Sequence, residues 1–243
     1  GVDIRKIELH WACMAGRCNI IDYNARGHGH IDMEIELAEP LILESLGKFY
    51  EGIPYAPDLL LIDKGWIGSW EENGEIKTWA TQPVETFCMD VGLDKCLPCH
   101  GAPRYKQPKM AQNLIVGDNW HINVGMGAAR KCSEVIWNKA HWTERAQDRI
   151  MLTTDHDEAL KLFKTDAEAK THQRFAKHIM EGLEGFYAKL RNPRKKNHKF
   201  RVDHWFDCVA QMLVAQSVLS RMRERKVKTV KFSEMRAARR AGR

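Results

Sequence analysis

The sequence lacks several features that would mark a membrane, secreted or motor protein. It has no run of about 18 consecutive apolar residues, which a membrane-spanning helix needs, and its first residues do not form a charged and then apolar signal segment. No G-x-x-x-x-G-K-[ST] sequence is present, so the chain is not a P-loop motor by itself. The seven cysteines are odd in number and scattered, which favours reduced thiols over a disulfide framework. The absence of a membrane-spanning run and of a signal segment predicts a soluble intracellular protein.

Length and hydrophobic content are sufficient for a sizeable core. The chain has 243 residues, 44% of them hydrophobic, and we expect one large domain at residues 1–220 followed by a basic C-terminal tail at residues 221–243. The chain begins with Gly1 rather than Met and reaches a candidate catalytic acid at Asp3, which suggests a fragment whose upstream part was removed.

The net charge of +6 is unevenly distributed. Residues 189–201 carry seven basic side chains and no acid, and residues 221–243 carry ten basic and two acidic side chains. The rest of the chain therefore has a net charge of −9. An acidic body with two basic segments is typical of a nuclease, because carboxylates hold metal ions and cations hold phosphate. The basic runs are also compatible with solvated surfaces.

Apolar patterns predict an α/β protein. Alternation and short apolar runs indicate strands, whereas apolar residues at spacings of three and four indicate helices. The predicted strands are residues 2–4, 7–14, 18–23 and 59–62, with less distinct strand-like runs at 84–89, 113–116 and 121–124. The predicted helices are residues 39–50, 155–190 and 202–222, the last with so broad an apolar surface that it should be buried.

Three acids lie within or at the end of apolar segments, where burying their carboxylates should cost free energy. Asp3 lies within the first strand, Asp63 ends a strand of four apolar residues, and Asp207 lies inside the last helix. A buried carboxylate normally has a partner, and divalent metal ions are suitable partners. Carboxylates from neighbouring strands and a facing helix could hold two Mg²⁺ or Mn²⁺ ions, which cut phosphodiesters by a two-metal mechanism.

Each acid also has a purely structural interpretation, as a strand-end or helix-cap residue that accepts hydrogen bonds from backbone N–H groups or pairs with an arginine. Asp203 and His204 lie four and three positions before Asp207, on the same side of the helix. Asp203 is either a further metal ligand or a helix cap. His204 contacts a phosphate, orients Asp207 or is a surface residue.

Three short motifs, in this order, resemble those of one enzyme family. Gly1-Val2-Asp3-Ile4 with the later Ile21-Asp22-Tyr23 is similar to the start of the nuclease domain of the tailed-bacteriophage terminase large subunit. Leu61-Ile62-Asp63-Lys64-Gly65-Trp66 is similar to its second acidic strand, and His204-Trp205-Phe206-Asp207 to its His-x-x-Asp helix. The order and rough separation agree from Asp3 to Ala215.

The resemblance implies an RNase H-like mixed β-sheet flanked by helices, with Asp3, Asp63 and Asp207 as catalytic metal ligands and Asp203 as a possible fourth. It also implies cleavage of concatemeric double-stranded DNA during viral genome packaging, in the cytoplasm of the infected host cell. The implied partners are the terminase ATPase domain, the small terminase subunit and the portal.

Residues 104–109 and residues 189–201 are two basic segments that could bind the DNA backbone. The segment before the last helix leads directly to Asp207, so it could place cations beside the metal ions. The predicted DNA-binding residues are Arg194, Lys195, Lys196, Lys199, Arg201, Arg104, Lys106 and His204. The Cys96-x-x-Cys99-His100 sequence has donors suited to structural Zn²⁺, but no second ligand pair is evident.

Two other functions remain open. A RuvC-type junction resolvase or a transposase-like nuclease would use the same acids. A catalytically silent DNA-binding module would use only the basic segments.

Overall fold

A nine-stranded mixed sheet organises the chain in the computed structural model. The structure describes residues 1–4, 8–27, 35–64, 69–72, 75–78, 81–109, 114–124, 132–153, 155–162, 173–177, 179–181, 184 and 204–241. Within these residues the strand order is β11-β3-β2-β1-β4-β7-β10-β9-β8, and a separate hairpin pairs β5 (Ser69–Glu72) with β6 (Glu75–Thr78). The expected α/β class, with a mixed sheet and flanking helices, is confirmed.

One half of the sheet is built on three antiparallel strands. β1 (Val2–Ile4), β2 (Glu8–Ala15) and β3 (Asn19–Gly27) form an antiparallel meander, and the short β11 (Lys161–Leu162) joins β3 in parallel. Gly16 has a φ of +63° in the turn between β2 and β3, a conformation that glycine adopts without steric cost.

The other half begins with parallel strands. β4 (Leu60–Asp63) runs parallel to β1, β7 (Cys96–Ala102) parallel to β4, and β10 (Glu134–Asn138) parallel to β7. β9 (Trp120–Asn123) and β8 (Leu114–Gly117) then complete the sheet in antiparallel pairs. Leu60, Leu61 and Ile62 are all buried, as expected for a strand covered on both faces.

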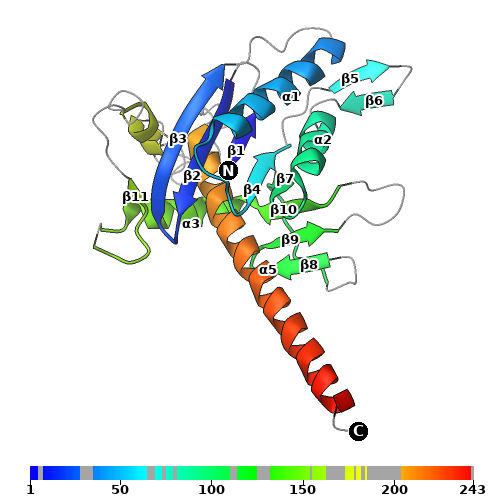
Figure 1. Ribbon diagram of the computed structural model, residues 1–243. Helices are drawn as coiled ribbons and strands as arrows, with labels where there is room; N and C mark the ends of the chain where they lie inside the picture. The colour runs from blue at the N-terminus through cyan, green and yellow to red at the C-terminus, as the bar shows by residue number, and fades with distance from the viewer. Residues whose placement is uncertain are drawn as a thin grey trace.

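Helices cover both faces of the sheet (Figure 1). α1 (Ile35–Gly52) and α2 (Thr81–Val91) pack on one face, where Val2, Leu60 and Ile62 join one hydrophobic cluster. α3 (Lys139–Met151) and α5 (His204–Ala241) pack on the other face, over a cluster that includes Leu61 and Leu97. In α5, every residue from Trp205 to Ala215 is buried, which confirms the expectation of a buried final helix.

Several sequence-based boundaries need correction. Residues 84–89 are helical within α2, not a strand, because Val84, Phe87, Cys88 and Val91 recur at helical spacing and pack towards the sheet. α1 begins earlier than predicted, at Ile35, so that Pro40 lies inside it. Residues 155–162 are turns followed by β11, not helix. Helix is present at residues 173–177, 179–181 and 184, and the rest of the predicted 163–190 helix lies outside the described residues.

The boundary expected at residue 220 falls inside α5. The helix continues to Ala241, so the basic segment is helical and continuous with the last helix of the body. None of the helices in the described part of the chain is both long enough and apolar enough to span a membrane.

Candidate active site

Two of the predicted acids lie side by side on adjacent strands. Val2 in β1 is the register partner of Ile62 in the parallel strand β4, so Asp3 and Asp63, the next residues of each strand, are neighbours. Val2 and Ile62 pack under α1 and α2. Because successive side chains of a strand alternate between faces, Asp3 and Asp63 face α5 instead. Asp3 is fully buried, and Asp63 is partly exposed.

Asp3 and Asp63 belong to a row of side chains that crosses the sheet beneath α5. Asp3 is the register partner of His10 in β2, and Asp63 is the partner of Cys99 in β7. Burial raises the pKa of the Cys99 thiol, and the negative charges of Asp63 and Asp3 raise it further. The strand registers place both carboxylates on the same side of the sheet as this thiol.

Asp207 comes to this row from the first turn of α5 and is buried. Its neighbour Cys208 has a pKa raised first by burial and then by the charges of Asp3 and Asp207. The Cys208 Sγ lies 3.5 Å from the carbonyl oxygen of His10, and the His10 ring meets Trp205 edge-on with centroids 5.3 Å apart. The beginning of α5 is thus packed directly against the part of the sheet that carries the acids.

A lysine that sequence reasoning missed completes the group. Lys139 Nζ donates to Asp207 Oδ2 at 3.0 Å, although the two residues are separated by 68 positions in the sequence. Lys139 is the first residue of α3, directly after β10. The one sequence signal for its position is Asn138, a good helix N-cap residue, which marks where α3 begins.

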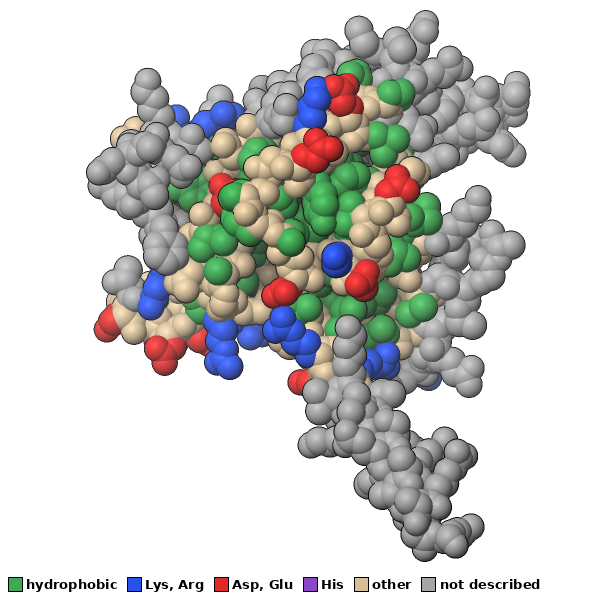
Figure 2. All heavy atoms as spheres, viewed as in Figure 1, with side chains coloured by type: hydrophobic (Ala, Val, Ile, Leu, Met, Phe, Trp, Pro, Cys, Tyr) green, Lys and Arg blue, Asp and Glu red, His purple; other side chains and the backbone are tan. Residues whose placement is uncertain are grey.

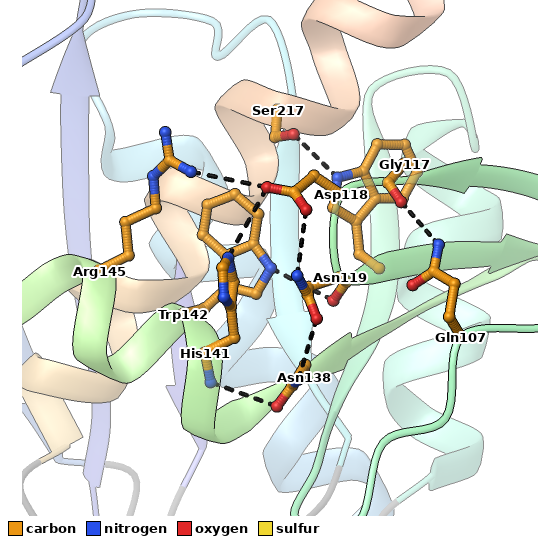
Figure 3. Close-up of polar contacts among 10 residues, drawn as sticks. Gln107, Gly117, Asp118, Asn119, Asn138, His141, Trp142, Arg145 and Ser217 are labelled. Atoms are coloured by element: carbon orange, nitrogen blue, oxygen red, sulfur yellow. Dashed lines mark hydrogen bonds and ion pairs between the residues drawn. The ribbon is translucent and has the colours of Figure 1, made fainter.

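A polar network fixes the start of α3 and therefore the backbone of Lys139 (Figure 3). The Asn138 side chain accepts a hydrogen bond from His141 N at 3.2 Å and donates to Asn119 Oδ1 at 3.1 Å. Asn119 adopts a positive φ of 54° in the turn between β8 and β9, and its carbonyl oxygen accepts from Trp142 Nε1 at 3.3 Å. This turn holds the N-terminus of α3 through both backbone and side-chain atoms.

The residue after Asp63 is held by acids on the opposite side of the sheet. Lys64 Nζ forms ion pairs with Glu85 of α2, at 2.9 Å, and with Glu134 of β10. Burial alone would lower the pKa of Lys64, but its hydrogen bonds to Glu134 and Glu85 outweigh burial and raise it. Lys64 N also donates to Cys99 O at 2.9 Å, which anchors the end of β4 beside β7.

The chemistry of Asp3, Asp63 and Asp207 suits hard divalent cations, because all three supply carboxylate oxygens. Within the described residues, however, no group of three or more His, Cys, Asp or Glu side chains is already arranged to hold a metal ion.

The predicted DNA-binding residues fall into two groups. Arg104 and Lys106 are exposed in the segment that follows β7, at the edge of the sheet where β4 also ends. His204 begins α5. The others lie outside the described residues, as does the candidate ligand Asp203: Arg194, Lys195, Lys196, Lys199 and Arg201.

The structure argues against one zinc ion bound by Cys96, Cys99 and His100. Cys96 packs in the cluster beneath α1 and α2, whereas Cys99 packs in the cluster on the other face of the sheet. The two thiols therefore point in opposite directions from β7 and cannot share an ion. The C-x-x-C spacing was misleading because an odd separation within a strand places the two side chains on different faces.

Comparisons with known proteins assign no family. No protein-family model matches the chain, and neither a curated protein nor a solved structure matches it significantly.

Proposed function

We propose that this chain is a metal-dependent DNA endonuclease, the RNase H-like nuclease domain of a viral DNA-packaging terminase that cuts concatemeric double-stranded DNA. The proposal rests on three acids from distant parts of the sequence that lie on the same side of the sheet or on the helix packed over it. Asp3 and Asp63 are neighbours on parallel strands, and Asp207 comes from the helix packed over them.

The sheet order supports the RNase H-like part of the proposal. A three-stranded antiparallel meander is followed by the parallel strands β4 and β7, in the order β3-β2-β1-β4-β7. An RNase H-like sheet has this arrangement, with acids on its first and fourth strands. The strands β10, β9 and β8 extend the sheet beyond that unit.

Asp3, Asp63 and Asp207 would hold two Mg²⁺ or Mn²⁺ ions, with Asp203 as a possible further ligand. Such ions lower the pKa of a bound water and neutralise charge on a phosphodiester. Asp3 and Asp63 lie on adjacent strands of the sheet, whereas Asp207 lies on α5 and accepts a hydrogen bond from Lys139. Arg104, Lys106 and the basic segment before α5 would hold the DNA backbone near the acids.

The terminase setting rests on the sequence resemblance. It supplies the proposed partners, which are the terminase ATPase domain, the small terminase subunit and the portal, and the proposed location in the cytoplasm of the infected host cell. A RuvC-type resolvase would use the same acids but would prefer four-way junctions to ordinary duplex DNA.

Cleavage of supercoiled plasmid in Mg²⁺, Mn²⁺ or EDTA tests the proposal. We expect metal-dependent nicking that falls at least 100-fold in Asp63→Asn and Asp207→Asn, because loss of one carboxylate charge weakens ion binding. Asp90→Asn, which changes an exposed acid of α2, is the matched control and should cut normally. DNA binding without cleavage in Mn²⁺, and no metal-induced thermal shift, would favour the silent binding module. Strong preference for a four-way junction would favour the resolvase.

A further inference from the structure

α5 extends well beyond the packed body of the protein. It spans 38 residues from His204 to Ala241, with no glycine or proline to interrupt it. Burial decreases towards its middle: Val218 is fully buried, whereas Arg223 and Glu224 are exposed. Figure 1 shows the orange-to-red end of the helix projecting away from the sheet. At a rise of about 1.5 Å per residue, residues 221–241 extend over roughly 30 Å.

This extension carries much of the basic charge of the sequence. Residues 221–241 include nine Lys or Arg and two Glu, a net charge of +7. Four of the basic positions recur on one side of a helix, because their separations of 3, 8 and 3 residues match the helical repeat. These positions are Arg225, Lys228, Arg236 and Arg239.

The body beside the base of the extension does not have the same excess of charge. A groove of about 990 Å³ there is lined by several arginines, but acids lie close to them. Arg145 lies 3.6 Å from Asp118, and Arg223 lies 3.1 Å from Asp58. Figure 2 likewise shows Lys and Arg side chains mixed with Asp and Glu along the lower edge of the body. Around this groove, the excess positive charge therefore belongs to the helical extension and not to the described residues of the body.

We propose that residues 221–241 of α5 bind the phosphate backbone of duplex DNA, as an arm separate from the cleavage site. The choice of DNA rests on the proposed nuclease function. A helix of this length runs beside roughly nine base pairs of duplex, and its net positive charge matches the dense negative charge of the phosphates. Binding is independent of base sequence, because contacts to phosphates carry no sequence information.

The arm and the acids belong to the same helix, so their separation is set by the helix itself. The middle of the arm, near Lys231, lies 24 residues after Asp207, or about 36 Å along the axis. The arm therefore holds the duplex on one side of the position where it is cut. Its contribution is to affinity for long DNA, and the chemistry at the acids does not depend on it.

Binding to a 40-bp duplex in EDTA, measured over a range of KCl concentrations, tests the arm. The variant Lys228→Glu/Arg236→Glu/Arg239→Glu, which reverses three of the four charges on one side of the helix, should bind at least 10-fold more weakly at 100 mM KCl. Its plot of log affinity against log salt concentration should lose about 0.9 unit of slope for each phosphate contact removed. Val230→Ala, an uncharged change in the same segment, is the matched control and should leave both affinity and slope unchanged. A chain ending at residue 225, checked by its circular dichroism and melting temperature, should behave like the triple variant.

Unchanged affinity and slope in the triple variant and in the shortened chain would overturn the proposal. It is also wrong if shortening converts a dimer into a monomer without changing the salt slope, since the segment then joins two copies of the chain. Failure of the nuclease proposal is distinguishable, because it appears as cleavage that persists in Asp63→Asn, while the arm is tested by binding alone.

Discussion

The ammonium group of Lys139 lies 3.0 Å from the carboxylate of Asp207, joining the start of α3 to the first turn of α5. Asp207 is almost fully buried, whereas the Lys139 side chain is partly exposed. A buried carboxylate is costly without a compensating charge or hydrogen bond. Lys139 therefore compensates the negative charge of Asp207, and under the proposed function it would compete with a divalent cation for this carboxylate.

Replacing Lys139 by methionine tests this relationship. We expect Lys139→Met to lower the free energy of unfolding by about 1 kcal/mol in EDTA, because one partner of a partly exposed ion pair is removed. The melting temperature should then rise more on addition of Mn²⁺ than it does in the wild type, because the metal ion replaces the missing positive charge. Lys139→Arg, which keeps the charge, is the control. An equal Mn²⁺-induced shift in wild type and Lys139→Met would show that Lys139 and the metal ion do not compete for Asp207.

Replacing Gly117 and Gly47 by alanine should have opposite effects on the free energy of unfolding. A Cβ atom on Gly117 would overlap the indole ring of Trp120, so Gly117→Ala must displace a buried indole and should cost about 1–3 kcal/mol. Gly47 lies inside α1 with nothing within 4 Å of the added atom, so Gly47→Ala should stabilise the protein by up to about 1 kcal/mol. Urea unfolding of the two variants measures both effects. Similar midpoints for the two would contradict the packing described around Trp120.

The residue Leu61 tests whether β4 is a central strand of the core. It is fully buried on the α5 face of the sheet, and Leu61→Ala should cost about 2–5 kcal/mol through lost burial and the cavity left behind. Met151 is 60% exposed at the end of α3, so Met151→Ala should change stability by less than about 0.5 kcal/mol. Thermal or urea unfolding provides the comparison. A cost for Leu61→Ala below about 1 kcal/mol would mean that β4 does not occupy a central position.

Stability should fall in mild acid because of His121. Burial lowers the pKa of His121 below its usual value of 6.5, although the charge of Glu134 partly opposes this, and its Nδ1 lies 3.0 Å from Tyr105 Oη. Because the folded-state pKa is the lower one, the unfolded chain binds more protons as the pH falls below about 6.5. Protonation of His121 therefore favours unfolding, and this loss grows until the pH reaches the folded-state pKa.

His121→Asn should remove this part of the pH dependence, because its amide oxygen can still accept a hydrogen bond from Tyr105 but does not titrate. The measurement is the free energy of unfolding at pH 7.5 and pH 5.5 for both proteins. The difference between the two pH values should be smaller in the variant. If both proteins lose the same stability on acidification, another group is responsible.

Local patterns were sufficient to predict much of the fold. Alternation and short apolar runs predicted β1, β2, β3 and β4, because successive side chains of a strand lie on opposite faces and the pattern is visible in neighbouring residues. The same pattern is misleading at residues 84–89, where a short apolar run predicts a strand although Val84, Phe87 and Cys88 follow a helical repeat. A run of this length satisfies both patterns, and only packing against the sheet distinguishes them.

The acids Asp3, Asp63 and Asp207 could be selected from the sequence, because each interrupts an apolar element in which a charge is costly. Their proximity, the pairing of Lys139 with Asp207 and the separation of Cys96 from Cys99 were decided only by the tertiary structure. The physical reason is the different sequence separation over which these features arise. Strand and helix periodicity is contained within windows of a few residues, whereas contacts across 60 to 200 residues depend on strand register and on how α5 packs over the sheet.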